Sequence, residues 1–264
     1  MSRKFKFIMA ILGIIWLILA PSIIMGYLND DPESGEVTYQ LDWAWGDATL
    51  TDEGWQVVND LGYTVTVTQG YLVSYSSTLI ECEHSHGMFD WLFGMTAPSV
   101  AYAGHGEDGV DPALLDTPHV ESLHQPQTVI TGTVIVPEPS YCQGHYLVAR
   151  GSSDTVGLPD DIEMYGTSLY IAGTYQSTDS DDRINFAVET SLANGGITDL
   201  MSESGDFIHA EISDETIEIT ITRQLDSLFD GVDFNTLSDD DIARSALWSL
   251  IDNTRLIVTS GKIH

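Results

Sequence analysis

The sequence has few positively charged residues. Its 264 residues include 9 lysines and arginines against 40 aspartates and glutamates, which gives a formal net charge of −31 at pH 7. A surface this acidic repels phosphate backbones and anionic headgroups, so nucleic acid is excluded from the expected partners. Two interpretations of the charge stay open: adaptation of the surface to a salty environment, and capture of cations by acidic loops.

The sequence also lacks the common signatures of enzymes. It contains no G-x-S-x-G, no H-E-x-x-H, no phosphate-binding loop, no dinucleotide-binding glycine pattern and no redox C-x-x-C. Carboxylates are too numerous for any one pair to be singled out as a general acid and base. We therefore predict that the protein is not an enzyme.

Long hydrophobic runs are absent except at the N-terminus. Three basic residues precede an apolar run from Phe7 to Leu28, the pattern of an export signal whose start stays in the cytoplasm. Cleavage after Ala20 is disfavoured by Pro21, and the whole run is long enough to cross a bilayer of roughly 30 Å. A cleaved signal peptide and a retained anchor in the cytoplasmic membrane both stay open. No cysteine follows the run, which excludes a lipoprotein anchor.

The expected organisation is a signal peptide or signal anchor over residues 1–28 and an extracytoplasmic domain over residues 29–264. The domain is therefore expected in the periplasm or on the extracellular face. A further boundary near residues 150–160 is an alternative to a single domain.

Short segments that alternate apolar and polar residues recur between Gly, Pro, Asn and Asp clusters. "YTVTVTQGYLVSYSSTLIEC", residues 63–82, predicts a pair of strands around Gly70, and "TVITGTVIV", residues 128–136, predicts another strand stopped by Pro137. Four further segments in the second half repeat the pattern. We predict a mainly β fold, an antiparallel β-sandwich.

Two stretches interrupt the strand pattern. Residues 87–127 are predicted to form a long loop insertion, apolar at first and then acidic. Near the C-terminus, Ser238 is a predicted N-cap and is followed by three aspartates that favour the positive end of a helix dipole. A short helix follows, and its expected buried face is made of Ile242, Ala246, Leu247, Leu250 and Ile251.

Cysteine is scarce, with only Cys82 and Cys142 in the chain. Two cysteines in an exported protein are expected to form a disulfide. Closing a loop of about 60 residues would stabilise the fold by roughly 4 kcal/mol in the chain-entropy model. The alternative is a Cys2His2 zinc site built from "CEH" and "CQGH", although this spacing matches no known finger pattern.

The histidines are clustered, with six of the eight between residues 84 and 145. On a strand His84 and His86 share one face, with Cα atoms about 7 Å apart, a spacing that suits two imidazoles on one ion. His105 is flanked by glycines, and His145 follows the second cysteine by three residues. We predict these four as metal ligands, and we assign His209 to a strand without a role. The alternative is that all of them are exposed polar residues.

Three stretches resemble bacterial periplasmic copper-binding proteins of the methanobactin-partner (MbnP-like) group. They are "YLVSYSSTLIEC", "MFDW" and "EITITRQLDSLFDGVDF", which together cover about a fifth of the chain. The resemblance implies an exported β-rich protein that handles copper outside the cytoplasm. It carries over no ligand, because the histidine arrangement matches no motif of that group.

These observations predict an extracytoplasmic metal-binding protein that captures or delivers an ion. Imidazole-rich sites suit copper or zinc, and Met88 and Met95 near the histidines favour copper over zinc. The alternative is a binding or structural module of the cell envelope, with residues 87–127 contacting a membrane or envelope protein partner. Oligomeric state is not predicted.

Overall fold

The structure is a computed structural model that describes residues 34–82, 111–137, 140–211, 216–260 and 262–263. The predicted signal or anchor lies outside the described residues, as do His84, His86 and His105. Within the described part of the chain, no helix is long and apolar enough to cross a membrane.

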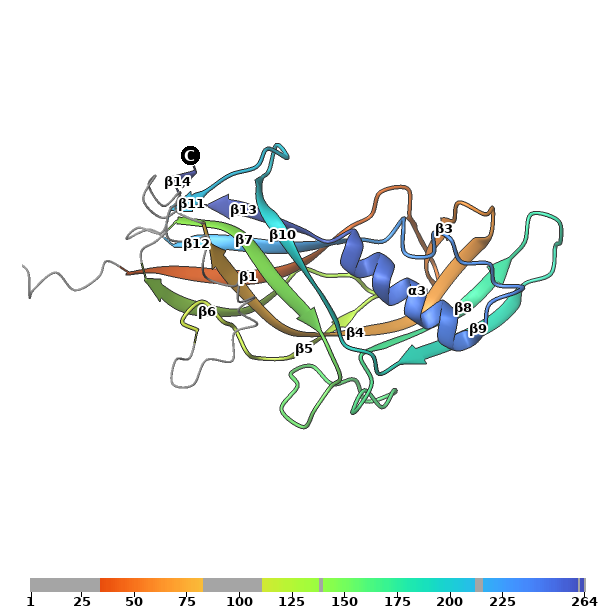
Figure 1. Cartoon of the computed structure of the whole chain (residues 1–264). Coiled ribbons are helices and arrows are strands. Elements are labelled where there is room, and N and C mark those ends of the chain that lie inside the picture. Colours follow the sequence, from red (N-terminus) through yellow and green to blue (C-terminus); the bar gives the residue numbers. More distant parts are fainter. Residues whose placement is uncertain (1–33, 83–110, 138–139, 212–215, 261, 264) are drawn as a thin grey trace, which may run out of the picture.

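Fourteen strands and one helix make up the described elements, and the predicted mainly β fold with a C-terminal helix is confirmed (Figure 1). The strands are β1 Ser34–Ala44, β2 Thr49–Thr51, β3 Gly54–Val58, β4 Thr64–Glu81, β5 His119–Ser122, β6 Val129–Pro137, β7 Ser140–Val148, β8 Leu169–Gln176, β9 Ile184–Thr190, β10 Asn194–Ser202, β11 Ala210–Glu211, β12 Ile217–Gln224, β13 Arg255–Ser260 and β14 Lys262–Ile263. The helix is α3, Asp239–Asp252.

All of these strands belong to one hydrogen-bonded sheet, which differs from the predicted sandwich of two sheets. Its main path runs β2-β3-β4-β7-β10-β13-β12-β1-β6. The pairs are mostly antiparallel, but β1 with β12 and β10 with β13 are parallel. The sheet stays continuous because β10 pairs with β7 along its first residues and with β13 along its last.

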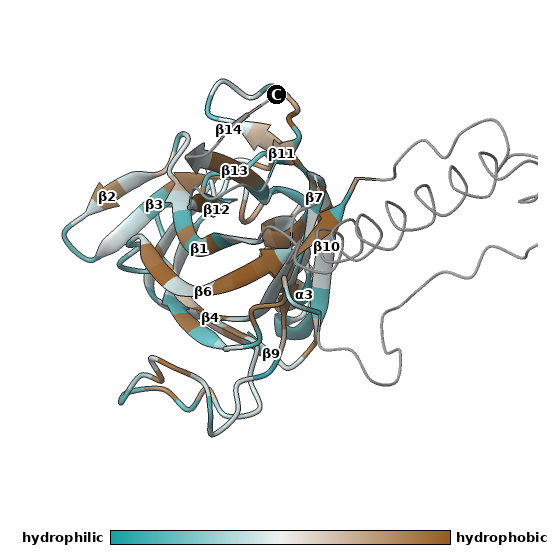
Figure 2. Cartoon of the chain, turned by 90° about the vertical axis from the view of Figure 1, so that its left-hand side faces the viewer, coloured by the Kyte–Doolittle hydropathy of each residue, from teal (hydrophilic) through white to brown (hydrophobic). Residues whose placement is uncertain are grey.

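The sheet curls until its last strand returns close to β4. The strand β5 pairs with β4, and the imidazole of His119 at its start donates a hydrogen bond of 2.9 Å to the carbonyl oxygen of Thr131 in β6. Leu115 bridges to Ser77 of β4 through backbone hydrogen bonds, and its side chain lies against Gly132 of β6. Residues 111–122, which are the described second part of the predicted insertion, therefore connect β4 to the edge strand β6. Figure 2 shows the strands arranged around a common interior.

The strand β4 is one strand of 18 residues, so the predicted pair of strands around Gly70 is wrong. A Cβ atom at Gly70 would lie 3.0 Å from the Cβ of Leu123 and 3.4 Å from the carbonyl oxygen of Tyr170. The close approach of neighbouring chains therefore favours a glycine here, and the chain makes no turn at this position. By contrast, the predicted strand ending at Pro137 is confirmed as β6.

The core lies inside the curled sheet and beneath α3. Alternate residues of β1 are buried, as a strand with one inward face requires: Val37, Tyr39, Leu41 and Trp43. The predicted helix face is also buried, and Ser238 caps the helix by accepting a hydrogen bond from the backbone N–H of Asp241. The helix packs mainly on β9 and β10 (Figure 1).

Candidate functional site

The predicted disulfide between Cys82 and Cys142 is confirmed. Cys82 directly follows β4, Cys142 lies in β7, and their Cα atoms are 4.9 Å apart. The backbone N–H of Cys82 donates to the carbonyl oxygen of Ser140 at 2.8 Å, which extends the pairing of the two strands to the disulfide. Because both sulfurs are bonded to each other, the predicted Cys2His2 thiolate site is not formed in this state.

His209, to which the sequence analysis assigned no role, lies beside this disulfide. In the pairing of β11 with β7, Ala210 is opposite Tyr141. Continuing this register by one residue places His209 opposite Cys142, and such cross-strand neighbours have Cβ atoms about 4.5–5.5 Å apart. A ring nitrogen of His209 and the sulfurs of both cysteines all lie within 4.8 Å of one another. No other group of three such ligand atoms is this close within the described residues.

The predicted ligand His145 is not part of this group. It lies three residues beyond Cys142 on β7, about 10 Å along the strand. Its strand neighbours are Thr78 of β4 and Ile197 of β10, and it is half-buried. Burial lowers the pKa of its imidazole below the ordinary value of 6.5. The ring is therefore held in the neutral form that metal ligation requires, but at a distance from the disulfide.

The surroundings of the disulfide carry negative charge. The buried phenol of Tyr141, next to Cys142, has a pKa raised to about 12, first by burial and then by the carboxylates of Glu81 and Asp111. Asp111 is held in place by a hydrogen bond of 2.7 Å from the hydroxyl of Thr78. A negative potential at this end of the sheet favours the approach of cations over anions.

A second polar group lies inside the curled sheet, where the sequence analysis proposed no site. The guanidinium of Arg223 on β12 contacts the carboxylate of Glu121 on β5 at 2.9 Å, and it donates to the hydroxyl of Ser74 on β4 at 2.8 Å. It also lies 5.9 Å from the ring centre of Trp43 on β1. Burial raises the pKa of Glu121, while Arg223 and Ser74 act against that rise.

The sequence contains one signal that could have predicted the buried group around Arg223. In "IEITITRQL" the apolar inward series Ile217, Ile219, Ile221 and Leu225 is interrupted by Arg223, which occupies an inward position. An arginine there requires a buried anionic partner. The group is fully enclosed, so we assign it to the fold and not to ligand binding.

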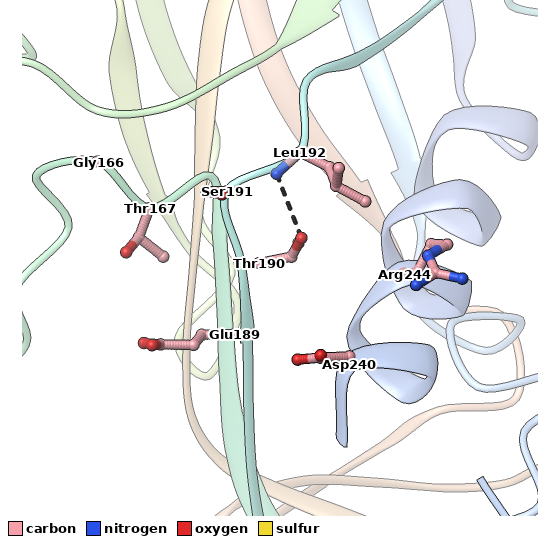
Figure 3. A pocket seen from close by; sticks show the side chains of 8 residues that line it. All are labelled: Gly166, Thr167, Glu189, Thr190, Ser191, Leu192, Asp240 and Arg244. Atoms are coloured by element: carbon pink, nitrogen blue, oxygen red, sulfur yellow. Dashed lines mark hydrogen bonds between the residues drawn. The ribbon is translucent and has the colours of Figure 1, made fainter. Parts of the chain in front are cut away.

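A groove of about 450 Å³ lies between the start of α3 and the end of β9. Figure 3 shows its lining: Gly166, Thr167, Glu189, Thr190, Ser191, Leu192, Asp240 and Arg244. The guanidinium of Arg244 is paired with Asp241 at 3.1 Å, and both side chains are more than two-fifths exposed. Because its charged groups are solvated, the groove resembles ordinary protein surface more than a binding site.

Comparison of the chain with protein-family models, with curated proteins and with solved structures finds no match. The functional conclusion therefore depends on the geometry of the disulfide end.

Proposed function

We propose that this protein is an extracytoplasmic metal-binding protein that captures or delivers copper, with zinc as the alternative, at the disulfide end of its sheet. The observation that carries the proposal is the exposed imidazole of His209 beside the Cys82–Cys142 bond. Copper and zinc are the ions that imidazole ligands suit. The resemblance to methanobactin-partner proteins agrees with this proposal and stays a prediction.

The predicted ligands His84, His86 and His105 lie outside the described residues and enter the proposal through their places in the sequence. His84 is two residues beyond Cys82, so chain length keeps their Cα atoms within about 7 Å of each other. His86 and His105 come between Cys82 and Asp111 in the sequence. Cys82 is hydrogen-bonded to Ser140 of β7, and Asp111 is hydrogen-bonded to Thr78 of β4. We therefore add His209 to the predicted ligands His84, His86 and His105, and assign His145 the weakest place among them.

The acidic residues near the disulfide attract the cation, but we do not propose them as its ligands. Glu81 and Asp111 lie close enough to the disulfide end to raise the pKa of Tyr141, so they also raise the local concentration of cations. This attraction acts over about 8–10 Å at physiological ionic strength, and added salt should slow capture more than it weakens the bound state.

Metal analysis of the full, unreduced chain tests the proposal. After exposure to Cu(II) or Zn(II) and gel filtration, the wild type should retain one equivalent, and the His84→Ala/His86→Ala variant should retain much less. His209→Ala should weaken binding to a smaller extent. His124→Ala is the matched control, because its ring is held by the backbone of Gly70 and the hydroxyl of Ser122 elsewhere on the sheet. Undiminished binding by the double variant would contradict the proposal.

The second candidate function is a binding or structural module of the cell envelope. The edge strand β6 favours it, because Ile130 and Ile135 are 65% and 70% exposed there. Leu115, in the described part of the predicted 87–127 insertion, lies against Gly132 of this strand. The envelope module would use the insertion together with β6 as its contact surface. Replacing both isoleucines by threonine should then abolish co-purification of the protein with its envelope partner. If the chain acts through metal alone, the same variant should keep full metal binding and function.

A further inference from the structure

The two sulfurs and the His209 imidazole form a set of three ligand atoms from three separate parts of the chain. They come from the residue after β4, from β7 and from the residue before β11. The cysteines are half-buried and the histidine is exposed, so the set is open to solvent from one side. In the oxidised protein the sulfurs are poor ligands, because it is the thiolate that binds metals.

The bond between the sulfurs is not the only contact that holds these three residues in place. Backbone pairing on each side holds them, since Tyr141 of β7 lies opposite both Glu81 of β4 and Ala210 of β11. The hydrogen bond from Cys82 to Ser140 adds one more tie at the disulfide itself. Cleavage of the disulfide would therefore leave the two thiols and the imidazole facing one another.

We propose that reduction of the Cys82–Cys142 disulfide creates a Cys2His metal site whose third ligand is His209. In this step a dithiol reductant gives two electrons and two protons to the disulfide, which becomes two thiols while the reductant becomes a disulfide. Binding of the cation then releases the two thiol protons as both thiolates coordinate. The proposal goes beyond the histidine site above, which concerns the oxidised chain.

The geometry suits a soft or borderline cation. Two thiolates on a tetrahedral ion with bonds of about 2.3 Å lie about 3.8 Å apart. The ligand atoms already lie within 4.8 Å of one another, so side-chain rotation is sufficient to form the site. Two sulfurs and one nitrogen suit Cu(I) in three-coordination, or Zn(II) with water as the fourth ligand. The nearby carboxylates of Glu81 and Asp111 attract either cation electrostatically.

The site would couple metal binding to redox state. A disulfide oxidant that accepts two electrons from the two thiolates and two protons from solvent becomes a dithiol, while the Cys82–Cys142 bond re-forms. This removes two of the three ligands at once, so the cation is released. Reduction restores the site. An exported protein that meets a dithiol donor would therefore load in the reduced form and deliver its ion on oxidation.

Cobalt(II) is the probe for the test, because thiolate ligation gives it an intense near-ultraviolet absorption. The full chain is reduced, freed of reductant under anaerobic conditions and titrated. The reduced wild type should bind one equivalent with this absorption, and the oxidised chain should not show it. Loss of an outer-shell partner already costs metal sites about 10- to 100-fold in affinity, so His209→Ala should weaken cobalt binding by at least about tenfold. His124→Ala should leave the affinity unchanged.

Two further variants separate this proposal from the histidine site. The reduced His84→Ala/His86→Ala chain should keep the thiolate absorption, whereas Cys82→Ser/Cys142→Ser should lose it and stay folded by circular dichroism. The proposal is overturned if the reduced wild type shows no thiolate absorption, if His209→Ala binds cobalt as tightly as the wild type, or if reduction unfolds the chain.

Discussion

The guanidinium of Arg223 reaches across the interior of the curled sheet and contacts the carboxylate of Glu121 at 2.9 Å. The two residues are 102 positions apart in the sequence, and their side chains are only 1% and 2% exposed. The contact joins β12 to β5, the strand that closes the gap between β4 and β6. Just before β5 in the chain, Leu115 pairs with Ser77 and Asp111 bonds to Thr78, both on β4.

We expect Arg223→Met to destabilise the protein strongly. It leaves the Glu121 carboxylate buried without its cation, which typically costs about 3–5 kcal/mol of unfolding free energy. Replacing both residues, as Arg223→Met with Glu121→Leu, should recover much of that loss. Urea unfolding measures both effects. Arg244→Met, which breaks only the exposed pair with Asp241, is the control and should change stability by less than about 1 kcal/mol. Equal effects of the two single variants would contradict the assignment.

Removing the disulfide should lower stability while the fold is kept. The two cysteines are separated by 60 residues, so the chain-entropy model gives a loss of about 4 kcal/mol for Cys82→Ser/Cys142→Ser. Thiol counting on the denatured, unreduced wild type should find no free thiol. Two reactive thiols in that assay would refute the disulfide.

Stability should fall as the pH drops below about 6.5, in part because of His145. Burial lowers the pKa of this imidazole in the folded state, so the unfolded chain binds its proton first as the pH falls. The contribution is fully present above the unfolded pKa and is lost toward and below the folded one. His145→Gln should flatten the decline between pH 7.5 and pH 5 in urea unfolding. Parallel curves for the variant and the wild type would show that His145 titrates alike in both states.

The N-cap of α3 should contribute measurably to stability. The Ser238 hydroxyl accepts the backbone N–H of Asp241 and satisfies one unpaired donor of the first turn. Ser238→Ala should therefore cost about 1 kcal/mol of unfolding free energy, whereas Ser238→Asp should keep most of it. Thermal unfolding of the two variants provides the comparison, and identical midpoints for Ser238→Ala and the wild type would exclude a capping role.

Several features followed from local sequence alone. The amphipathic face of α3, its cap at Ser238 and the strand ending at Pro137 all depend on residues close together in the chain. The disulfide followed from counting, since the chain has only two cysteines to pair. The number of strands in residues 63–82 did not follow, because a glycine predicts a turn and a close packing contact equally well. Gly70 serves the second purpose.

The arrangement of the site required the tertiary structure. Sequence placed His145 near the disulfide because it is three residues from Cys142, but an extended strand carries those three residues about 10 Å. His209 is close instead, because β11 pairs with β7 in a register that sets it opposite Cys142. Periodicity determines which residues of a strand share a face. Which strands become neighbours, and in which register, is decided by the packing of the whole sheet.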